Sequence, residues 1–122
     1  MRNSSKAFAA AIAPAAERLD PCRLLLEPGR SVVANAGALV ATVIRVKTSG
    51  ERRFVIVDAA MNDLIRPSLY QAYHAIVPLR VRAGPVSPCD VVGPVCESGD
   101  FLALDRPLPP LESGDRLAVL SA

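Results

Sequence analysis

The chain of 122 residues has no tryptophan, only five other aromatic residues, and a formal charge of just +2. Dedicated nucleic-acid binding requires a basic face and usually stacking rings, so this composition argues against a nucleic-acid partner. Charges or prolines interrupt every hydrophobic stretch before it reaches the roughly 18 apolar residues of a membrane-spanning helix. One histidine and three cysteines without C-x-x-C spacing predict neither a disulfide framework nor a metal site. These features indicate a reduced, cytoplasmic protein without a membrane partner.

About half of the residues are apolar (51%), which is enough for a packed core in one domain or a piece of one. Twelve of the 14 basic residues are arginine. Arginine is the side chain best suited to a two-point grip on carboxylates and phosphates, so anionic ligands are favoured.

The first twenty residues predict an amphipathic helix with Phe8, Ile12, Ala16 and Leu19 on one face and a kink at Pro14. Two basic residues followed by a run of small residues also fit a signal peptide superficially. The run is alanine rather than leucine and acidic residues follow at once, which favours the helix.

The rest of the chain is typical of β-structure. A short apolar run at Arg23–Leu26 predicts a strand that ends at the turn Glu27–Arg30. Strands within Ser31–Val46 and at Arg53–Asp58 are expected to pair as a hairpin. Further strands are expected at His74–Arg82, Asp90–Val95, Phe101–Leu104 and Arg116–Ser121. The predicted class is mainly β: an antiparallel barrel or sandwich preceded by one helix and one strand.

Three clusters could carry chemistry, although each also has an ordinary structural explanation. In Glu27-Pro28-Gly29-Arg30, an acid and an arginine lie at the end of a buried-looking strand, where α/β barrels keep their active sites. A solvated turn with an ion pair explains the same residues.

The second cluster lies in the segment from Asp58 to Tyr70. Arg66 precedes a proline, so its backbone is expected to be extended, with its guanidinium and the Tyr70 hydroxyl presented from a loop. A surface loop with a satisfied tyrosine is the plain alternative.

In the third cluster, Cys96 and Glu97 stand side by side at a glycine-containing corner, where they could act as a proton donor and an amine ligand. A free cysteine is more often a small buried hydrophobic residue. The tetrapeptide Glu-Ser-Gly-Asp occurs at 97–100 and again at 112–115, which predicts two similar turns.

Taken together and in this order, EPGR, DAAMNDLIRPSLY and CESGD resemble the pyridoxal-phosphate-dependent decarboxylases of alanine-racemase-like fold. CESGD and RPSLY are similar to the diaminopimelate decarboxylases of that family, which convert meso-2,6-diaminopimelate to L-lysine and carbon dioxide in lysine biosynthesis. The resemblance implies that residues 1–36 are the last helix and strand of a truncated (β/α)8 barrel. It implies that residues 37–122 are a C-terminal β domain lacking its final residues.

The resemblance also implies roles for individual residues. Glu27 pairs with the pyridinium nitrogen of pyridoxal 5'-phosphate, and Pro28, Gly29 and Arg30 lie by its phosphate. Arg30 and Arg66 hold substrate carboxylates, and Tyr70 adds a hydroxyl. Glu97 receives the distal amino group, and Cys96 donates a proton to the carbon that loses carbon dioxide.

The chain departs from the family in one important way. Its only lysines, Lys6 and Lys47, do not match the lysine that forms the Schiff base with the cofactor. We therefore expect the chain alone to be inactive. The resemblance also implies that the complete enzyme is a homodimer with active sites shared between subunits, because the Cys96–Glu97 corner enters the active site of the neighbouring subunit. The alternatives are a non-catalytic partner or remnant that docks on a full-length decarboxylase, and a related decarboxylase of another amino acid or polyamine precursor.

Overall fold

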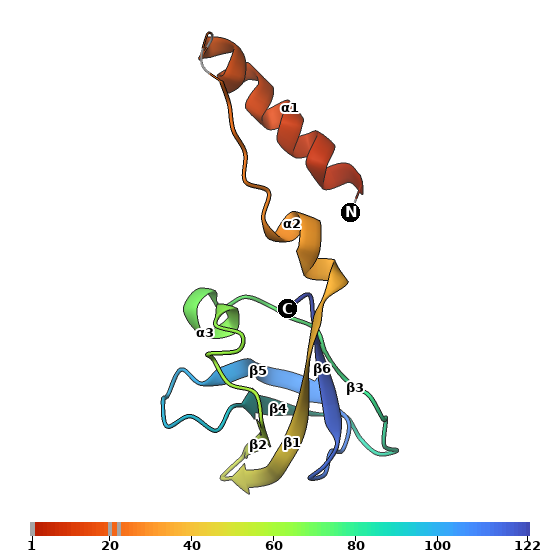
Figure 1. Ribbon diagram of the computed structural model, residues 1–122. Helices are drawn as coiled ribbons and strands as arrows, with labels where there is room; N and C mark the ends of the chain where they lie inside the picture. Colours follow the sequence, from red (N-terminus) through yellow and green to blue (C-terminus); the bar gives the residue numbers. More distant parts are fainter. Residues whose placement is uncertain (1, 20, 22) are drawn as a thin grey trace.

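A computed structural model describes residues 2–19, 21 and 23–122, with side chains from residue 6 onward within those ranges (Figure 1). The chain begins with helix α1 (Arg2–Arg18), which confirms the predicted helix and keeps Pro14 inside it. An extended segment then leads to a short helix, α2 (Arg30–Val33), and a 3-10 turn, η1 (Ala34–Ala36). In Figure 1, α1 and this segment lie beside each other and project away from the β-structure.

Two predictions for this N-terminal part are wrong. Residues 23–26 are not in a strand, because no other strand of the described chain lies beside them to share backbone hydrogen bonds. The start of the expected strand at Ser31–Val46 is helical instead. Both the backbone N–H and the hydroxyl of Ser31 donate to the Pro28 carbonyl, at 3.1 and 2.7 Å, and this turns the chain into α2.

The remainder is a nearly closed mixed β-barrel. Its strands are β1 (Ala38–Ser49), β2 (Arg52–Val57), β3 (Ile76–Pro78), β4 (Ser87–Val92), β5 (Phe101–Leu108) and β6 (Arg116–Leu120). They are ordered β3-β6-β1-β2-β4-β5, so the long strand β1 joins both halves of the sheet. The predicted hairpin is confirmed as the antiparallel pair β1–β2, which turns at Gly50 in the left-handed region (φ 59°).

The antiparallel description of this sheet is right for all pairs but one. Strand β2 pairs with β4 in parallel, with Val55 opposite Val91. A parallel pair requires a long connection, and here it is the segment that contains helix α3 (Arg66–Tyr70) and the edge strand β3. Strand β5 is also longer than the strand expected at Phe101–Leu104, because it continues through Pro107 and Leu108.

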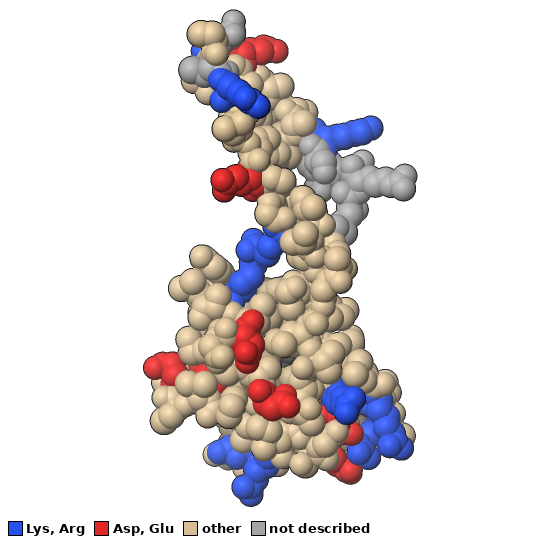
Figure 2. Space-filling view, viewed as in Figure 1, with Lys and Arg blue, Asp and Glu red and all other residues tan. Residues whose placement is uncertain are grey.

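The core follows from side-chain alternation along these strands. Its most buried members are large aliphatic residues that are almost fully inaccessible: Val43, Val55, Val57, Val91, Leu102, Leu117 and Val119. The outer face of β3, β6 and β1 is also apolar, with Val40, Val77 and Leu120 exposed. On the face shown in Figure 2, broad uncharged areas separate the charged side chains. No helix in the described part of the chain is long and apolar enough to cross a membrane.

Candidate functional site

Two of the three predicted clusters meet on the barrel. The loop of residues 93–100 connects β4 to β5 and carries the Cys96–Glu97 corner, and α3 carries Arg66 and Tyr70. Ser68 on α3 donates its hydroxyl to the Gly99 carbonyl and lies 3.4 Å from the Phe101 carbonyl oxygen. The structure therefore ties the Arg66 helix directly to the Cys96–Glu97 loop.

The loop is organised from inside by Asp100, which is only 4% exposed. One carboxylate oxygen accepts the Val95 N–H at 2.7 Å, and the other accepts the Met61 N–H at 2.7 Å. The Asp100 carbonyl also accepts the Gly93 N–H at 3.1 Å. Hydrogen bonds to an ionised acceptor are the strong ones, so this carboxylate fixes the two ends of the loop and joins it to the segment before α3.

Helix α3 begins at Arg66, and this differs from the extended conformation expected for a residue before proline. Pro67 is tolerated because it lies in the first turn, where its missing N–H has no helical acceptor to lose. Arg66 is half-buried and Tyr70 is 66% exposed one turn later, with the guanidinium carbon 5.8 Å from the tyrosine ring centroid. The Arg66 Nε atom is buried and has no hydrogen-bond partner in the described chain. None of the ion pairs among the described residues involves Arg66, so its guanidinium has no carboxylate partner there.

Cys96 and Glu97 are both exposed at the tip of the loop. The Glu97 carbonyl accepts the Asp100 N–H at 3.0 Å, and one Glu97 carboxylate oxygen lies 3.3 Å from the Gly99 nitrogen, which donates to it. The thiol and carboxylate are thus presented to the outside on a turn whose backbone is fixed. Among the described residues, no set of three or more His, Cys, Asp or Glu side chains is arranged to hold a metal ion.

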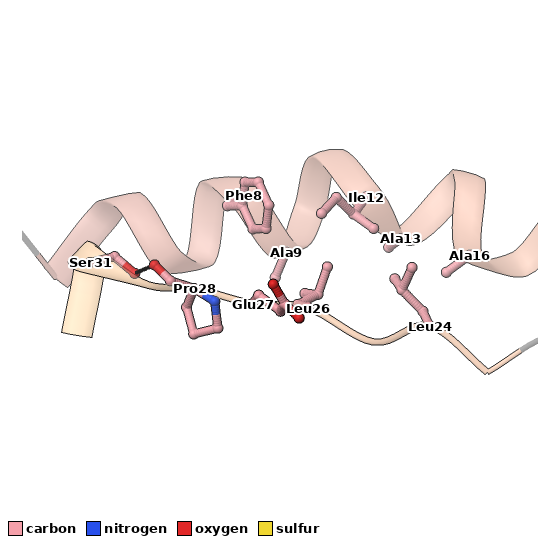
Figure 3. A pocket seen from close by; sticks show the side chains of 10 residues that line it. All are labelled: Phe8, Ala9, Ile12, Ala13, Ala16, Leu24, Leu26, Glu27, Pro28 and Ser31. Atoms are coloured by element: carbon pink, nitrogen blue, oxygen red, sulfur yellow. Dashed lines mark hydrogen bonds between the residues drawn. The ribbon is translucent and has the colours of Figure 1, made fainter. Parts of the chain in front are cut away.

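The remaining predicted cluster, Glu27–Arg30, lies on the segment between α1 and the barrel. Figure 3 shows Glu27 and Pro28 beside the face of α1 that carries Phe8 and Ile12. A groove of about 920 Å3 runs there, lined mainly by apolar side chains and by the Glu27 carboxylate. Gly29 has φ 49°, a left-handed conformation that favours glycine and confirms the predicted turn. Within the described residues, no hydrogen bond or ion pair links Glu27–Arg30 to the other two clusters.

The two Glu-Ser-Gly-Asp segments form similar turns, as predicted. In the second, the Asp115 N–H donates to the Glu112 carbonyl at 3.1 Å, and Asp115 is likewise buried. Its carboxylate accepts the Glu112 N–H and two bonds from Arg82, at 2.8 and 3.0 Å. The hydrogen bonds from Arg82 and from the Glu112 backbone lower the pKa of Asp115. This second turn is a structural counterpart of the first, and it carries none of the predicted site residues.

Sequence reasoning missed Ser68 and Asp100. Both lie inside the quoted motifs, but their role depends on partners far away in the chain. A signal was available in the repeat itself, because a buried aspartate that ends a turn usually accepts backbone N–H groups.

The sequence profile described as "Pyridoxal-dependent decarboxylase, C-terminal sheet domain" matches residues 22–122, and the chain belongs to this family. Its relatives define the family further. The diaminopimelate decarboxylase of Aquifex aeolicus is 53% identical over 100 residues, which cover 82% of this chain and 24% of that protein. The diaminopimelate decarboxylase of Vibrio cholerae is 51% identical over 115 residues, covering 94% of this chain and 27% of that protein.

Among solved structures, the diaminopimelate decarboxylase from Helicobacter pylori complexed with L-lysine has a TM-score of 0.76 and 49% identity. The match covers 93% of the present chain and 28% of the Helicobacter pylori chain. The similarity therefore extends from sequence to the arrangement of the strands. The chain spans about a quarter of the length of the curated relatives it matches.

Proposed function

We propose that this chain is the C-terminal part of a pyridoxal-phosphate-dependent diaminopimelate decarboxylase, which converts meso-2,6-diaminopimelate to L-lysine and carbon dioxide in the cytoplasm. The observation that carries the proposal is the junction between α3 and the 93–100 loop. It brings the Arg66 segment and the Cys96–Glu97 corner to one region of the barrel through Ser68. Sequence identity above 50% to diaminopimelate decarboxylases supports this choice of substrate.

The substrate carries two carboxylates and two amino groups, and the side chains of the three clusters together match those charges. Arg30 and Arg66 are the proposed partners of the carboxylates, since a guanidinium grips a carboxylate with two parallel hydrogen bonds. Tyr70 adds a hydroxyl from the same face of α3 as Arg66. Glu97 is the proposed partner of the distal ammonium group. Cys96 is the proposed proton donor to the reacting carbon, because a thiol can donate a proton and this one is exposed at the tip of the loop.

The described residues fit one side of the cofactor. The Glu27 carboxylate lies at the apolar groove beside α1 and makes no hydrogen bond or ion pair within the described chain, so it is available to a pyridinium nitrogen. Pro28, Gly29 and Arg30 follow on the same turn and are the proposed neighbours of the phosphate. When bound, the cofactor supplies an electron sink for the carbon that loses carbon dioxide.

The covalent anchor of the cofactor is not matched in this chain. Lys47 lies beside the β1–β2 turn with its Nζ 5.7 Å from the Phe54 ring centroid, and Lys6 lies on α1. From the resemblance we assign residues 1–36 to the end of a (β/α)8 barrel and residues 37–122 to the β domain, and we place the anchoring lysine on another segment of the complete enzyme. The chain by itself is expected to release no carbon dioxide from meso-diaminopimelate in the presence of pyridoxal phosphate.

A chimera tests this proposal. In it, the present chain replaces the matched segment of the Aquifex aeolicus diaminopimelate decarboxylase, and lysine formation is followed by mass spectrometry. The proposal predicts lysine formation, which Cys96→Ala abolishes or slows strongly while the visible absorbance of the bound cofactor remains. A folded chimera that binds the cofactor but forms no lysine would contradict the proposal.

Two further experiments separate the alternatives. A non-catalytic docking partner predicts a heterodimer with a full-length decarboxylase in native mass spectrometry, together with an inactive chimera. A decarboxylase of another amino acid or polyamine precursor predicts a chimera that prefers that substrate. If Glu97→Gln leaves the preference for diaminopimelate unchanged, the assignment of Glu97 to the distal amine is wrong.

A further inference from the structure

The Asp100 carboxylate is placed to hold two separate parts of the candidate site at once. Its two oxygens accept the N–H groups of Met61 and Val95, both at 2.7 Å, from segments that are far apart in the sequence. Met61 lies in the segment that leads into α3 and Arg66, whereas Val95 directly precedes Cys96. Both oxygens must act as acceptors here, and an ionised carboxylate is the side chain of this size that does so.

The space around Asp100 shows that this arrangement is closely fitted. A Cβ atom added at Gly93 would lie 2.4 Å from one carboxylate oxygen and 2.6 Å from the other. The loop backbone therefore packs directly on the carboxylate. Ser68 supplies the second tie, from α3 to the Gly99 carbonyl. The loop is consequently bound to the α3 segment at its Gly99–Asp100 end, and Asp100 joins that end to Val95 across the Cys96–Glu97 corner.

We infer that Asp100 is a positioning residue that fixes the Cys96–Glu97 corner on the barrel, although Asp100 itself contacts no reacting group. This inference rests on the proposed function. Without the carboxylate, the loop can move independently of the segment before α3, and the proposed proton donor Cys96 and its neighbour Glu97 lose their fixed placement. Misplacement by about 1 Å is enough to reduce turnover about a hundredfold.

The test compares Asp100→Asn with Asp115→Asn in the chimera. Asparagine keeps the size of the side chain but turns an NH2 group toward one of the two backbone N–H donors. Asp115 is the matched control, because it is a buried carboxylate in the same place of the second Glu-Ser-Gly-Asp turn and contacts Arg82 and Glu112 instead. The first readout is amide hydrogen exchange at Met61 and Val95. The second is the pair kcat and KM, with cofactor absorbance as the check that the active site is loaded.

Asp100→Asn is expected to speed exchange at both Met61 and Val95 and to lower kcat/KM about ten- to a hundredfold with the cofactor still bound. Asp115→Asn is expected to leave both amides protected and kcat/KM within about threefold. The inference alone fails if the unsubstituted chimera is active and Asp100→Asn lowers kcat/KM no more than Asp115→Asn does. If the unsubstituted chimera folds and binds the cofactor but is inactive, that result contradicts the proposed function itself.

Should Asp100→Asn prevent folding, Gly93→Ala decides the question. Its added Cβ displaces the Asp100 carboxylate, whereas Gly99→Ala in the same loop meets nothing and is the control. A lower kcat/KM together with faster exchange at Met61 and Val95 supports the inference. Kinetics equal to those of the Gly99→Ala chimera in a folded Gly93→Ala chimera overturn it.

Discussion

The close contact between Gly93 and Asp100 leads to a specific prediction about alanine substitution. Gly93 and Gly99 lie at opposite ends of the same loop, and neither is in the left-handed region. The space around them differs: a Cβ at Gly93 would be 2.4 Å from the Asp100 carboxylate, whereas a Cβ at Gly99 would meet nothing within 4 Å. Gly93→Ala and Gly99→Ala therefore form a matched pair that differs in this contact.

The magnitude follows from the hydrogen bonds that must change. Ordinary van der Waals contact with a Cβ begins at about 3.4 Å, so the carboxylate must move by about 1 Å, and its 2.7 Å bonds to Met61 and Val95 cannot both survive. Losing one hydrogen bond to a charged acceptor costs about 1.5–3 kcal/mol, and overpacking adds about 1 kcal/mol or more. We expect Gly93→Ala to lower the free energy of unfolding by about 3 kcal/mol. Gly99→Ala should change it by less than about 1 kcal/mol, because it only restricts the unfolded chain.

Urea unfolding followed by circular dichroism measures both values. At a slope of about 1–3 kcal/mol per molar urea, Gly93→Ala moves the midpoint down by about 1–3 M. The lost protection should be largest at the Met61 and Val95 amides in hydrogen exchange. If the free energies of unfolding of the Gly93→Ala and Gly99→Ala variants differ by less than about 1 kcal/mol, the reasoning is refuted. That result would mean that the loop accommodates a methyl group without moving the carboxylate.

Three further predictions follow from burial and electrostatics. Iodoacetamide should label the exposed Cys96 much faster than Cys89, which is buried and donates its S–H to a backbone carbonyl, and whose pKa is raised by burial; equal rates in peptide mapping would contradict this. Because its arginine partner and backbone bonds lower the pKa of Asp115, the stability that Asp115 contributes is present above about pH 4 and lost as the pH falls through the folded-state pKa. In unfolding measurements at low pH, Asp115→Asn should therefore lose less stability on acidification than the unsubstituted chain, and parallel curves would count against that linkage. Leu117→Ala, at a fully buried position of β6, should cost about 2–5 kcal/mol, whereas Leu104→Ala at a half-exposed position should cost much less; similar losses in urea would show that the core is misplaced.

The sequence was sufficient for those parts of the fold that depend on neighbouring residues. The β1–β2 hairpin follows from two β-rich runs around Gly50, and the two similar turns follow from a repeated tetrapeptide. The parallel pairing of β2 with β4 could not be predicted in this way, because it joins strands separated by α3 and β3 and depends on how the whole sheet closes. Residues 23–26 read as a strand from their apolar pattern, but a strand also needs a neighbour, and pattern alone does not supply one.

The candidate site was likewise predictable only in part. The residue types that suit the chemistry, such as Arg66, Cys96 and Glu97, stand in recognisable motifs. Their proximity depends on Ser68 and Asp100, whose partners come from other parts of the chain. Only the folded structure shows that Asp100 binds a backbone N–H at Met61, so its importance was not evident beforehand.

We propose that this chain supplies one flank of an active site whose anchoring lysine lies on another segment, and that its Cys96–Glu97 corner acts in the active site of the neighbouring subunit. The most direct test mixes two inactive forms of the chimera, one with Cys96→Ala and one with the cofactor-anchoring lysine of the barrel replaced by alanine. Random exchange of subunits in a symmetric dimer gives one intact site in each mixed dimer and restores about a quarter of the unsubstituted activity. Mixed dimers confirmed by native mass spectrometry that still form no lysine would contradict the claim.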